Sequence, residues 1–474
     1  MRLFIGNQNL LRRFVAPKSI FLQHNRASRL FSTSTIKCSL ISSIPKNTLD
    51  SISSLPEISD VLLKIKSKNS PSSSHIEGID RSSEIFQQIN PNGEEYKAVQ
   101  ILKVQVLSQL YQFDQAIQTI DEIQEKCILN DEETFQLSLA KTKSLFYKGS
   151  FDKAIEISTN LCDFVPQMNG NDSTYVALRQ GIALNAQALC RLVNIGLKDE
   201  QVAMAQKEEY NQEISSKLGE ATEIQEICAM SSKILERNAE MGSNLHLNLA
   251  CAASYSNQGI AELTTSLVQS KSMQYLVPMD SAMNSWRSAL SILEDIERDS
   301  TVLNALGHEE IIFMKSTKAR TYANMTWALL FSDAYASTGN SSVNEETLKL
   351  ASEYAGLALK INDEIENADQ NLGRILTLVA SCYARAGSAV TAEGLFQSSM
   401  DILEENTLHP FITLDARNAY LNYSNLCKNW EKRSADAKKY KQLALEYDDS
   451  LIGSSWHGIC SLYSGLHLFG TSEL

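Results

Sequence analysis

Proline and glycine are scarce in this chain of 474 residues, which contains 8 Pro and 20 Gly. Folds made of many short strands need these residues in their turns, so all-β sandwiches and barrels are disfavoured. Collagen-like and proline-rich assemblies are excluded by the same counts. Hydrophobic residues make up 43% of the chain, enough for a large core. At roughly 100–200 residues per domain, the length allows two to four globular domains or one extended repeat array.

Long hydrophobic runs are also missing, and the mean hydropathy of −0.20 argues against a polytopic membrane protein. Residues 241–261 and 450–472 contain no charged side chain, but Asn, Gln, Ser, Gly and His interrupt both stretches. A spanning helix needs about 20 predominantly apolar residues, so we expect no transmembrane span. Peripheral association with a membrane stays open. For residues 451–474 we predict a capping helix followed by a short tail.

Catalytic and metal-binding motifs are absent. The sequence has no Gly-rich phosphate loop, no G-x-G-x-x-G, no G-x-S-x-G and no H-E-x-x-H. The nine cysteines include no C-x-x-C and sit mostly among apolar neighbours, which favours buried free thiols. His457 and His467 flank Cys460, and we interpret them as polar residues of the closing helix. We therefore assign no catalytic, cofactor-binding or metal-ligating residue and predict a protein that is not an enzyme.

Acidic residues are missing from the first 49 positions, where Arg and Ser are abundant. This composition is typical of an organellar presequence, so we predict that residues 1–40 direct import and are then cleaved. The segment Arg29–Ser34 resembles a mitochondrial processing site, with a mature start near Ser32 or Ser39. A mitochondrial protein, in the matrix, is the favoured interpretation. A plastid protein and a basic N-terminus without a targeting role are the alternatives.

The remainder of the chain is strongly acidic. The seven charged residues before Pro45 are all basic, so removing their +7 from a net charge of −13 leaves −20 for the rest. Such a surface repels phosphate backbones, and we expect no nucleic-acid partner unless a local basic patch exists. Residues 41–92 are rich in serine and contain only short apolar runs. We predict that they form a flexible linker with one or two marginal helices.

Helical periodicity begins at Glu94. Tyr96, Val99, Leu102 and Val106 recur at steps of three or four residues, which predicts an amphipathic helix. A second helix follows at Phe113 after a very short connector, and short connectors produce antiparallel neighbours. The same pattern continues to about residue 450, so we predict an all-α domain over residues 93–450. The later pairs are expected at 132–148 with 151–165, 172–196 with 213–238, 242–270 with 278–298, 308–337 with 344–363, 367–386 with 389–405, and 411–429 with 431–447.

Several segments of this domain resemble the tetratricopeptide repeat (TPR) family. The residues that carry the resemblance are Val379, Ala380, Tyr383, Gly387, Ala392 and Phe396; Gly149, Phe151, Ala154, Ile155 and Pro166; and Phe113, Ala116 and Ile117. The resemblance implies a right-handed superhelical array of antiparallel helix pairs, a TPR-like α-solenoid, with a groove that binds peptides or partner helices. Another helical-hairpin array, such as a HEAT-like one, is the alternative fold.

The spacing of the repeats departs from the family. Successive reference alanines lie 38 residues (Ala116 to Ala154), 41 (Ala351 to Ala392), 45 (Ala392 to Ala437) and 69 residues (Ala282 to Ala351) apart. The family repeat is about 34 residues long. The gap of 69 predicts longer central helices, which would change the shape of the groove.

One set of polar residues is a candidate peptide-binding site. Arg320, Asn324 and Trp327 lie at i, i+4 and i+7, on one stripe of a predicted helix. By resemblance to family members that clamp C-terminal carboxylates, these residues would line the groove, with Arg374 and Arg417 on the following first helices of pairs. Arg–carboxylate pairs are strong and directional. In the alternative interpretation, Trp327 belongs to the core and Arg320 is an ordinary exposed charge.

These features predict a non-enzymatic scaffold or adaptor of mitochondria that binds a protein or peptide. The resemblance suggests assembly of an organellar complex, such as a respiratory one, or chaperone-type binding of client proteins. An RNA-binding helical-repeat regulator of organellar gene expression is the alternative. It requires basic residues at fixed repeat positions, which the acidic body lacks. A catalytic helical domain with an unrecognised site is a third possibility.

Overall fold

The structure is a computed structural model that describes residues 44–66, 72–90, 93–168, 173–197, 207–240, 245–273, 279–336, 344–365, 369–404 and 410–446. These residues form 18 α-helices and two short 3-10 turns, with no strand among them. The predicted all-α fold is therefore confirmed. The predicted presequence, residues 1–40, and the predicted capping segment, residues 451–474, lie outside the described residues.

The first helices of the chain are short. They are α4 (Lys46–Ile52), α5 (Pro56–Lys66), α6 (Ser73–Ile89), α7 (Glu94–Gln109), α8 (Phe113–Lys126), α9 (Asp131–Tyr147) and α10 (Phe151–Phe164). The central helices are α11 (Ser173–Leu197), α12 (Lys207–Glu240), α13 (Leu245–Met273), α14 (Asp280–Arg298), α15 (Ser300–Ala305) and α16 (His308–Ala336). The last are α17 (Glu345–Asp363), α18 (Asp369–Arg385), α19 (Ala389–Glu404), α20 (Pro410–Lys428) and α21 (Ser434–Glu446).

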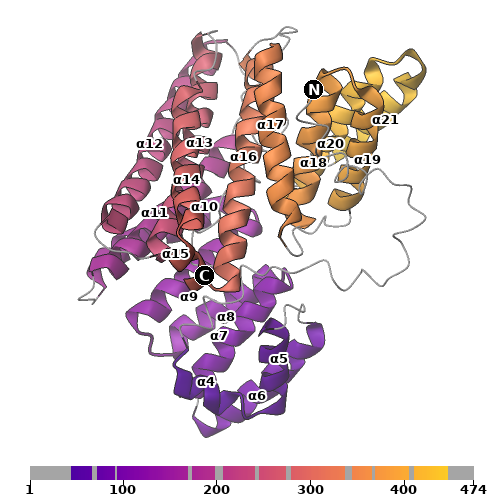
Figure 1. Ribbon diagram of the computed structural model, residues 1–474. Coiled ribbons are helices and arrows are strands. Elements are labelled where there is room, and N and C mark those ends of the chain that lie inside the picture. Colours follow the sequence, from indigo (N-terminus) through magenta and orange to yellow (C-terminus); the bar gives the residue numbers. More distant parts are fainter. Residues whose placement is uncertain are drawn as a thin grey trace.

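The central helices are longer than those of the first pairs, as the repeat spacing predicted. Helix α12 has 34 residues and α13 and α16 have 29 each, whereas α8 and α10 have 14. The long helices stand side by side in Figure 1. The short helix α15 is an insertion that periodicity did not predict. The Asp299 side chain caps it by accepting hydrogen bonds from the backbone N–H groups of Thr301 and Val302.

Helices that follow one another in sequence pack against each other along the whole array. From α7 onward, the first helix of each pair contacts its own second helix, and the second helix contacts the first helix of the next pair. First helices also contact one another in the order α9, α11, α13, α16, α18 and α20. Contacts between consecutive second helices are sparse by comparison. The first helices therefore form the more tightly spaced row of a solenoid-like array.

Three pairs share the same turn between their helices. Gly149 and Gly387, both expected at turns, have φ values of 80° and 79°, and Tyr111 takes the equivalent conformation with φ 58°. In each turn the next residue donates its N–H to a carbonyl five positions earlier, Gln112 to Leu107, Ser150 to Leu145 and Ser388 to Tyr383, at 2.9 Å. This is the Schellman arrangement, which satisfies the carbonyls at a helix end. The shared turn is independent evidence of a structural repeat.

Glycines let paired helices approach closely at two corresponding places. A Cβ atom at Gly181 of α11 would lie 2.5 Å from the Leu235 side chain of α12, and one at Gly373 of α18 would lie 2.6 Å from Leu403 of α19. In both pairs the carbonyl of the glycine accepts a hydrogen bond from a serine, Ser231 in the first and Ser399 in the second. The serine and the leucine are four residues apart, so they share one face of the second helix.

The linker prediction for residues 41–92 is wrong for the residues described there. Helices α4 and α6 pack on α7, and α5 packs on α6. Ile52, Ile58, Val61 and Ile79 are fully buried in one hydrophobic cluster that includes residues of α7, α8 and α9. The high serine content is a misleading signal of a linker here. A serine hydroxyl can donate a hydrogen bond to the carbonyl four residues earlier, as Ser82 does to Gly78 at 3.0 Å, and a serine bonded in this way can be buried in a helix.

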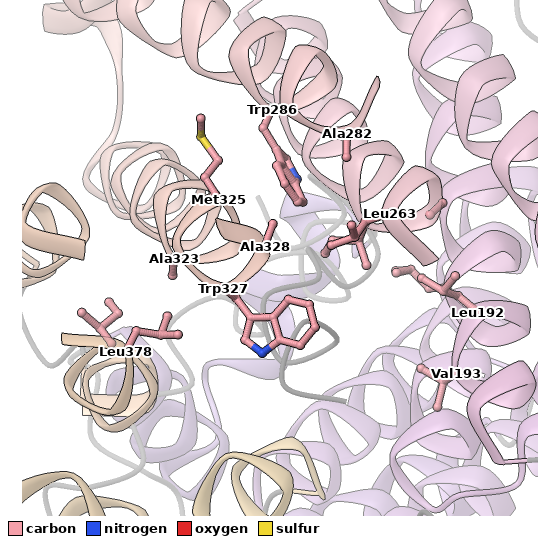
Figure 2. Packing of buried hydrophobic residues seen from close by; sticks show 14 of the residues in the cluster. Leu192, Val193, Leu263, Ala282, Trp286, Ala323, Met325, Trp327, Ala328 and Leu378 are labelled. Atoms are coloured by element: carbon pink, nitrogen blue, oxygen red, sulfur yellow. The ribbon is translucent and has the colours of Figure 1, made fainter. Parts of the chain in front are cut away.

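A second, much larger hydrophobic cluster runs from α9 to α21. Figure 2 shows its centre, where Trp327 and Ala328 of α16 lie near Trp286 of α14 and Leu263 of α13. Trp286 is fully buried and donates a hydrogen bond of 3.0 Å to the Ser256 carbonyl. Helix α9 contributes to both clusters, so it joins the N-terminal helices to the rest of the array.

Candidate functional site

The structure brings most of the predicted peptide-binding residues together on three consecutive first helices. Arg320 and Asn324 lie on α16, Arg374 lies on α18 and Arg417 lies on α20. Side chains of these three helices interact in one cluster, which we call the α16–α18–α20 cluster and which consists of Arg320, Asn324, Asn371, Arg374 and Asp415. Arg417 is buried on α20, but it lies two residues from Asp415 and therefore on a different face of that helix. Sequence reasoning missed two members, Asn371 on α18 and Asp415 on α20.

Hydrogen bonds connect α16 and α18 within this cluster. Arg374 donates from Nη2 to Oδ1 of Asn324 at 2.7 Å. Arg320 donates from Nε to Oδ1 of Asn371 at 3.1 Å, and Asn371 donates in turn to the Ser316 hydroxyl at 3.3 Å. The predicted stripe on α16 therefore exists, but its polar groups bind a neighbouring helix.

The charged groups of the cluster influence one another. Burial lowers the pKa of Arg374 to about 10, an effect opposed by the carboxylate of Asp415 and reinforced by the charge of Arg320. The guanidinium thus stays protonated at neutral pH, inside the protein. A buried arginine needs a buried acceptor, but the burial of Arg374 is not visible in the sequence, so no sequence signal pointed to Asp415.

Most of the cluster is closed to a ligand. Asn324 has no exposed surface, and Arg374, Arg417 and Asp415 are 2–3% exposed. Trp327 is 3% exposed and belongs to the hydrophobic cluster, as the alternative interpretation held. Arg320 and Asn371 are partly exposed. A peptide carboxylate could reach these two residues directly, but it could reach the buried residues only if the three helices separated. The clamp stays a prediction that rests on Arg320.

The cluster retains hydrogen-bonding capacity. Within the described residues, Nε of Arg374 and Nδ2 of Asn324 are buried donors without a hydrogen-bond partner. Buried unsatisfied donors cost stability, typically about 1–3 kcal/mol each. An additional acceptor placed beside them would therefore be bound favourably.

A second polar contact joins first helices nearer the N-terminus. Arg179 of α11 forms an ion pair of 2.6 Å with Glu132 of α9, and the same carboxylate accepts a hydrogen bond from the Tyr175 hydroxyl. The Arg179 guanidinium also lies 5.2 Å from the centre of the Phe135 ring and 4.9 Å from that of Tyr175. All these side chains except Phe135 are partly exposed, so they are accessible to a partner along the row of first helices.

No model of a known protein family matches the chain, and no curated protein matches it significantly.

The described cysteines do not form a reactive centre. Burial raises the pKa of Cys228, Cys251 and Cys382 to about 12, and it raises that of Cys190 even further. Thiols with such pKa values are protonated at neutral pH and are poor nucleophiles. In the part of the chain that the structure describes, no group of His, Cys, Asp and Glu has an arrangement that could hold a metal ion.

A shallow, open hollow of about 660 Å³ lies beside α12, lined by Met230, Lys233, Arg237 and neighbouring residues. Its lining also includes Glu226, so it holds charged groups of both signs. Among the described helices, none combines the length and the apolar character needed to cross a bilayer.

Proposed function

We propose that the protein is a non-enzymatic scaffold or adaptor that binds a protein or peptide along its row of first helices. The observation that supports the proposal most is the continuous contact of α9, α11, α13, α16, α18 and α20, each to the next, while the second helices stay apart. This spacing makes the row of first helices the inner side of the array. Inner surfaces of such arrays are suited to extended peptides and partner helices.

The inner row offers partly exposed polar groups for such a partner. Arg320 with Asn371, and Arg179 with Glu132, occupy successive positions along it. Both arginines already have internal partners that hold their side chains in place, so little conformational entropy would be lost on binding. An acidic segment of a partner protein fits these groups best.

The Arg-rich, Ser-rich segment before Cys38 supports mitochondria as the compartment. A mitochondrial scaffold of this kind would serve in the assembly of an organellar complex, for example a respiratory one. An RNA-binding regulator is favoured less, because the chain after Pro45 carries a net charge of about −20, which repels phosphate backbones.

Proximity labelling in intact cells tests this proposal. The labelling enzyme is fused to the C-terminus, and mass spectrometry identifies both the labelled neighbours and the N-terminal peptide of the fusion. We expect mitochondrial assembly factors among the neighbours and a mature start near Ser32 or Ser39. Cytosolic or plastid neighbours with an intact leader would contradict the compartment, and a neighbour set dominated by RNA-processing proteins would support the RNA-binding alternative.

Two variants show whether the inner row is the binding surface. Arg320→Ala removes a partly exposed group of the inner row, and we expect it to remove specific neighbours from the labelled set. Lys349→Ala changes an exposed lysine of α17 on the outer row and should leave the set unchanged. Equal effects of the two variants, with unchanged thermal unfolding, would contradict the proposed surface.

A further inference from the structure

A cluster of exposed lysines lies at the C-terminal end of the array. Residues 428–446 contain six basic and three acidic residues, a net charge of +3, whereas the whole chain carries −13. Five lysines are exposed there, and we call them the C-terminal lysine cluster: Lys428, Lys432, Lys438, Lys439 and Lys441. This is the local basic patch that overall composition conceals.

The positive charge of this cluster is available to a partner. Arg433, in the same segment, is already bound within the protein, because it pairs with Glu393 of α19 and with Asp436 of α21. The pair with Arg433 also occupies the carboxylate of Asp436, which would otherwise be available to neutralise the charge of a lysine. Among the described residues, neither Lys438 nor Lys441 has an ion pair or a hydrogen bond.

An apolar residue lies on the same face of α21 as two lysines of the cluster. Ser434, Lys438, Lys441 and Leu445 lie at i, i+4, i+7 and i+11, which places them on one stripe of α21. Leu445 is 42% exposed, although it is a large hydrophobic residue. An adjacent face of α21 is fixed to the protein through Ala437 and Ala444, which are buried. The exposed stripe is therefore cationic with an apolar end.

The position of α21 leaves this stripe open to a flat surface. Within the described residues, α21 packs against α20 and the short turn before it, and it lies at one end of the array in Figure 1. A planar partner can approach this end of the array, whereas a long polyanion bound along the array would meet the net negative charge of the rest of the chain.

We propose that the C-terminal lysine cluster and Leu445 form a docking surface for an anionic lipid bilayer. Lysines near an anionic membrane surface contribute additively through their charge, and an adjacent apolar side chain can enter the headgroup region. Docking through α21 holds one end of the array at the membrane and leaves the inner row of first helices free for a protein partner.

Nucleic acid is a less suitable occupant because the aromatic rings nearby are already covered. Single-stranded nucleic acids bind by stacking bases on exposed aromatic side chains. The Arg433 guanidinium lies 5.5 Å from the centre of the Trp430 ring, and Lys439 lies 5.3 Å from that of Tyr440. The Tyr440 ring also packs edge-on against Tyr423, with their centroids 4.7 Å apart. One face of Trp430 and the ring of Tyr440 are therefore already engaged within the protein.

Co-sedimentation with lipid vesicles tests the proposal on the full chain. The vesicles contain phosphatidylcholine alone or phosphatidylcholine with about one third phosphatidylglycerol. We expect binding only to the anionic vesicles at 0.05 M NaCl and release at 0.5 M, because salt screens exposed charges. Each lysine changes the partition coefficient about fivefold, so Lys438→Glu with Lys441→Glu should weaken binding by at least about 25-fold. Leu445→Ser should leave binding measurable but more sensitive to salt.

A matched control variant separates the effect of the cluster from the effect of a change in net charge. Lys349→Glu with Lys360→Glu makes the same change of charge at two exposed positions of α17, and it should reduce binding much less. The proposal is overturned if the anionic vesicles do not bind the wild-type protein or if both double variants bind equally. It is also overturned if a 20-nucleotide RNA competes for the cluster and binds more tightly than the vesicles. Circular dichroism confirms that each variant is folded.

Discussion

Lys97 of α7 and Glu133 of α9 form a buried ion pair in which Nζ lies 2.8 Å from the carboxylate. The two residues are 5% and 1% exposed. Lys97 also donates to the Ile128 carbonyl at 3.3 Å, and Glu133 accepts a hydrogen bond of 3.0 Å from the Asn130 N–H as part of the capping box of α9. One lysine therefore joins the first helices of two pairs to the loop between them.

Replacing Lys97 by Met should destabilise the protein strongly, because Glu133 would keep its charge in a buried site without a cation. Loss of one partner of a buried pair typically costs about 3–5 kcal/mol in the free energy of unfolding. Urea denaturation measures this change. The double variant Lys97→Met with Glu133→Gln should recover more than half of the loss. If the double variant is as unstable as the single one, the ion pair is not the cause.

The same pair predicts a loss of stability at high pH. Burial lowers the pKa of Lys97, but its hydrogen bonds to Glu133 and Glu94 and the charges of these carboxylates outweigh this effect and raise the pKa above 10.5. A folded-state pKa above the unfolded value stabilises the protein below pH 10.5, and this contribution disappears as pH rises through the folded-state pKa. Urea denaturation from pH 9 upward should show a decline that Lys97→Met lacks.

Alanine substitutions at two glycines should have opposite effects. Gly387 has a φ of 79° with no atom within 4 Å of an added Cβ, so Gly387→Ala introduces only backbone strain. We expect it to cost about 1–2 kcal/mol. Gly356 in α17 also has open space around it, and Gly356→Ala should stabilise the protein by up to about 1 kcal/mol. Thermal unfolding of the two variants measures the sign of each change in stability. A stabilising effect of Gly387→Ala would contradict the described turn.

The buried thiols should resist alkylation in the folded protein. Burial raises the pKa of Cys228, Cys251 and Cys382 to about 12, so almost no thiolate is present at pH 8. We expect iodoacetamide to modify these residues only after unfolding in guanidinium chloride. Cys127 is partly exposed and should react earlier. Peptide mass spectrometry reports each site separately, and rapid native labelling of Cys382 would contradict its burial.

The helices of the array could be predicted from the sequence because their signals are local. Apolar residues at steps of three and four mark the buried face of α7, and a glycine marks the turns at Gly149 and Gly387. The same reasoning failed for α4 to α6, since their short apolar runs and many serines look like linker composition. Only packing against α7 shows that Ile58 and Ile79 are core residues.

The candidate site was predicted less completely. The stripe of Arg320, Asn324 and Trp327 on one helix follows from spacing, whereas Arg374 and Arg417 on later first helices were included because of the resemblance to the TPR family. Burial does not follow from spacing, because it depends on how closely α16, α18 and α20 stack. The sequence could not tell that Arg374 binds Asn324 inside the protein, nor that Asp415 belongs to the same group.

The sequence by itself determined the all-α class, the order and approximate ends of most helices, and the contrast between a basic N-terminal segment and an acidic remainder of the chain. These properties depend on residues that are near one another in the chain or on simple sums. Tertiary structure decided which polar groups are enclosed and which are presented to a partner. Lys97 and Arg374 are enclosed, whereas Lys438 and Lys441 are exposed. Whether a polar side chain is enclosed or exposed depends on contacts between helices far apart in sequence, and local periodicity does not encode these contacts.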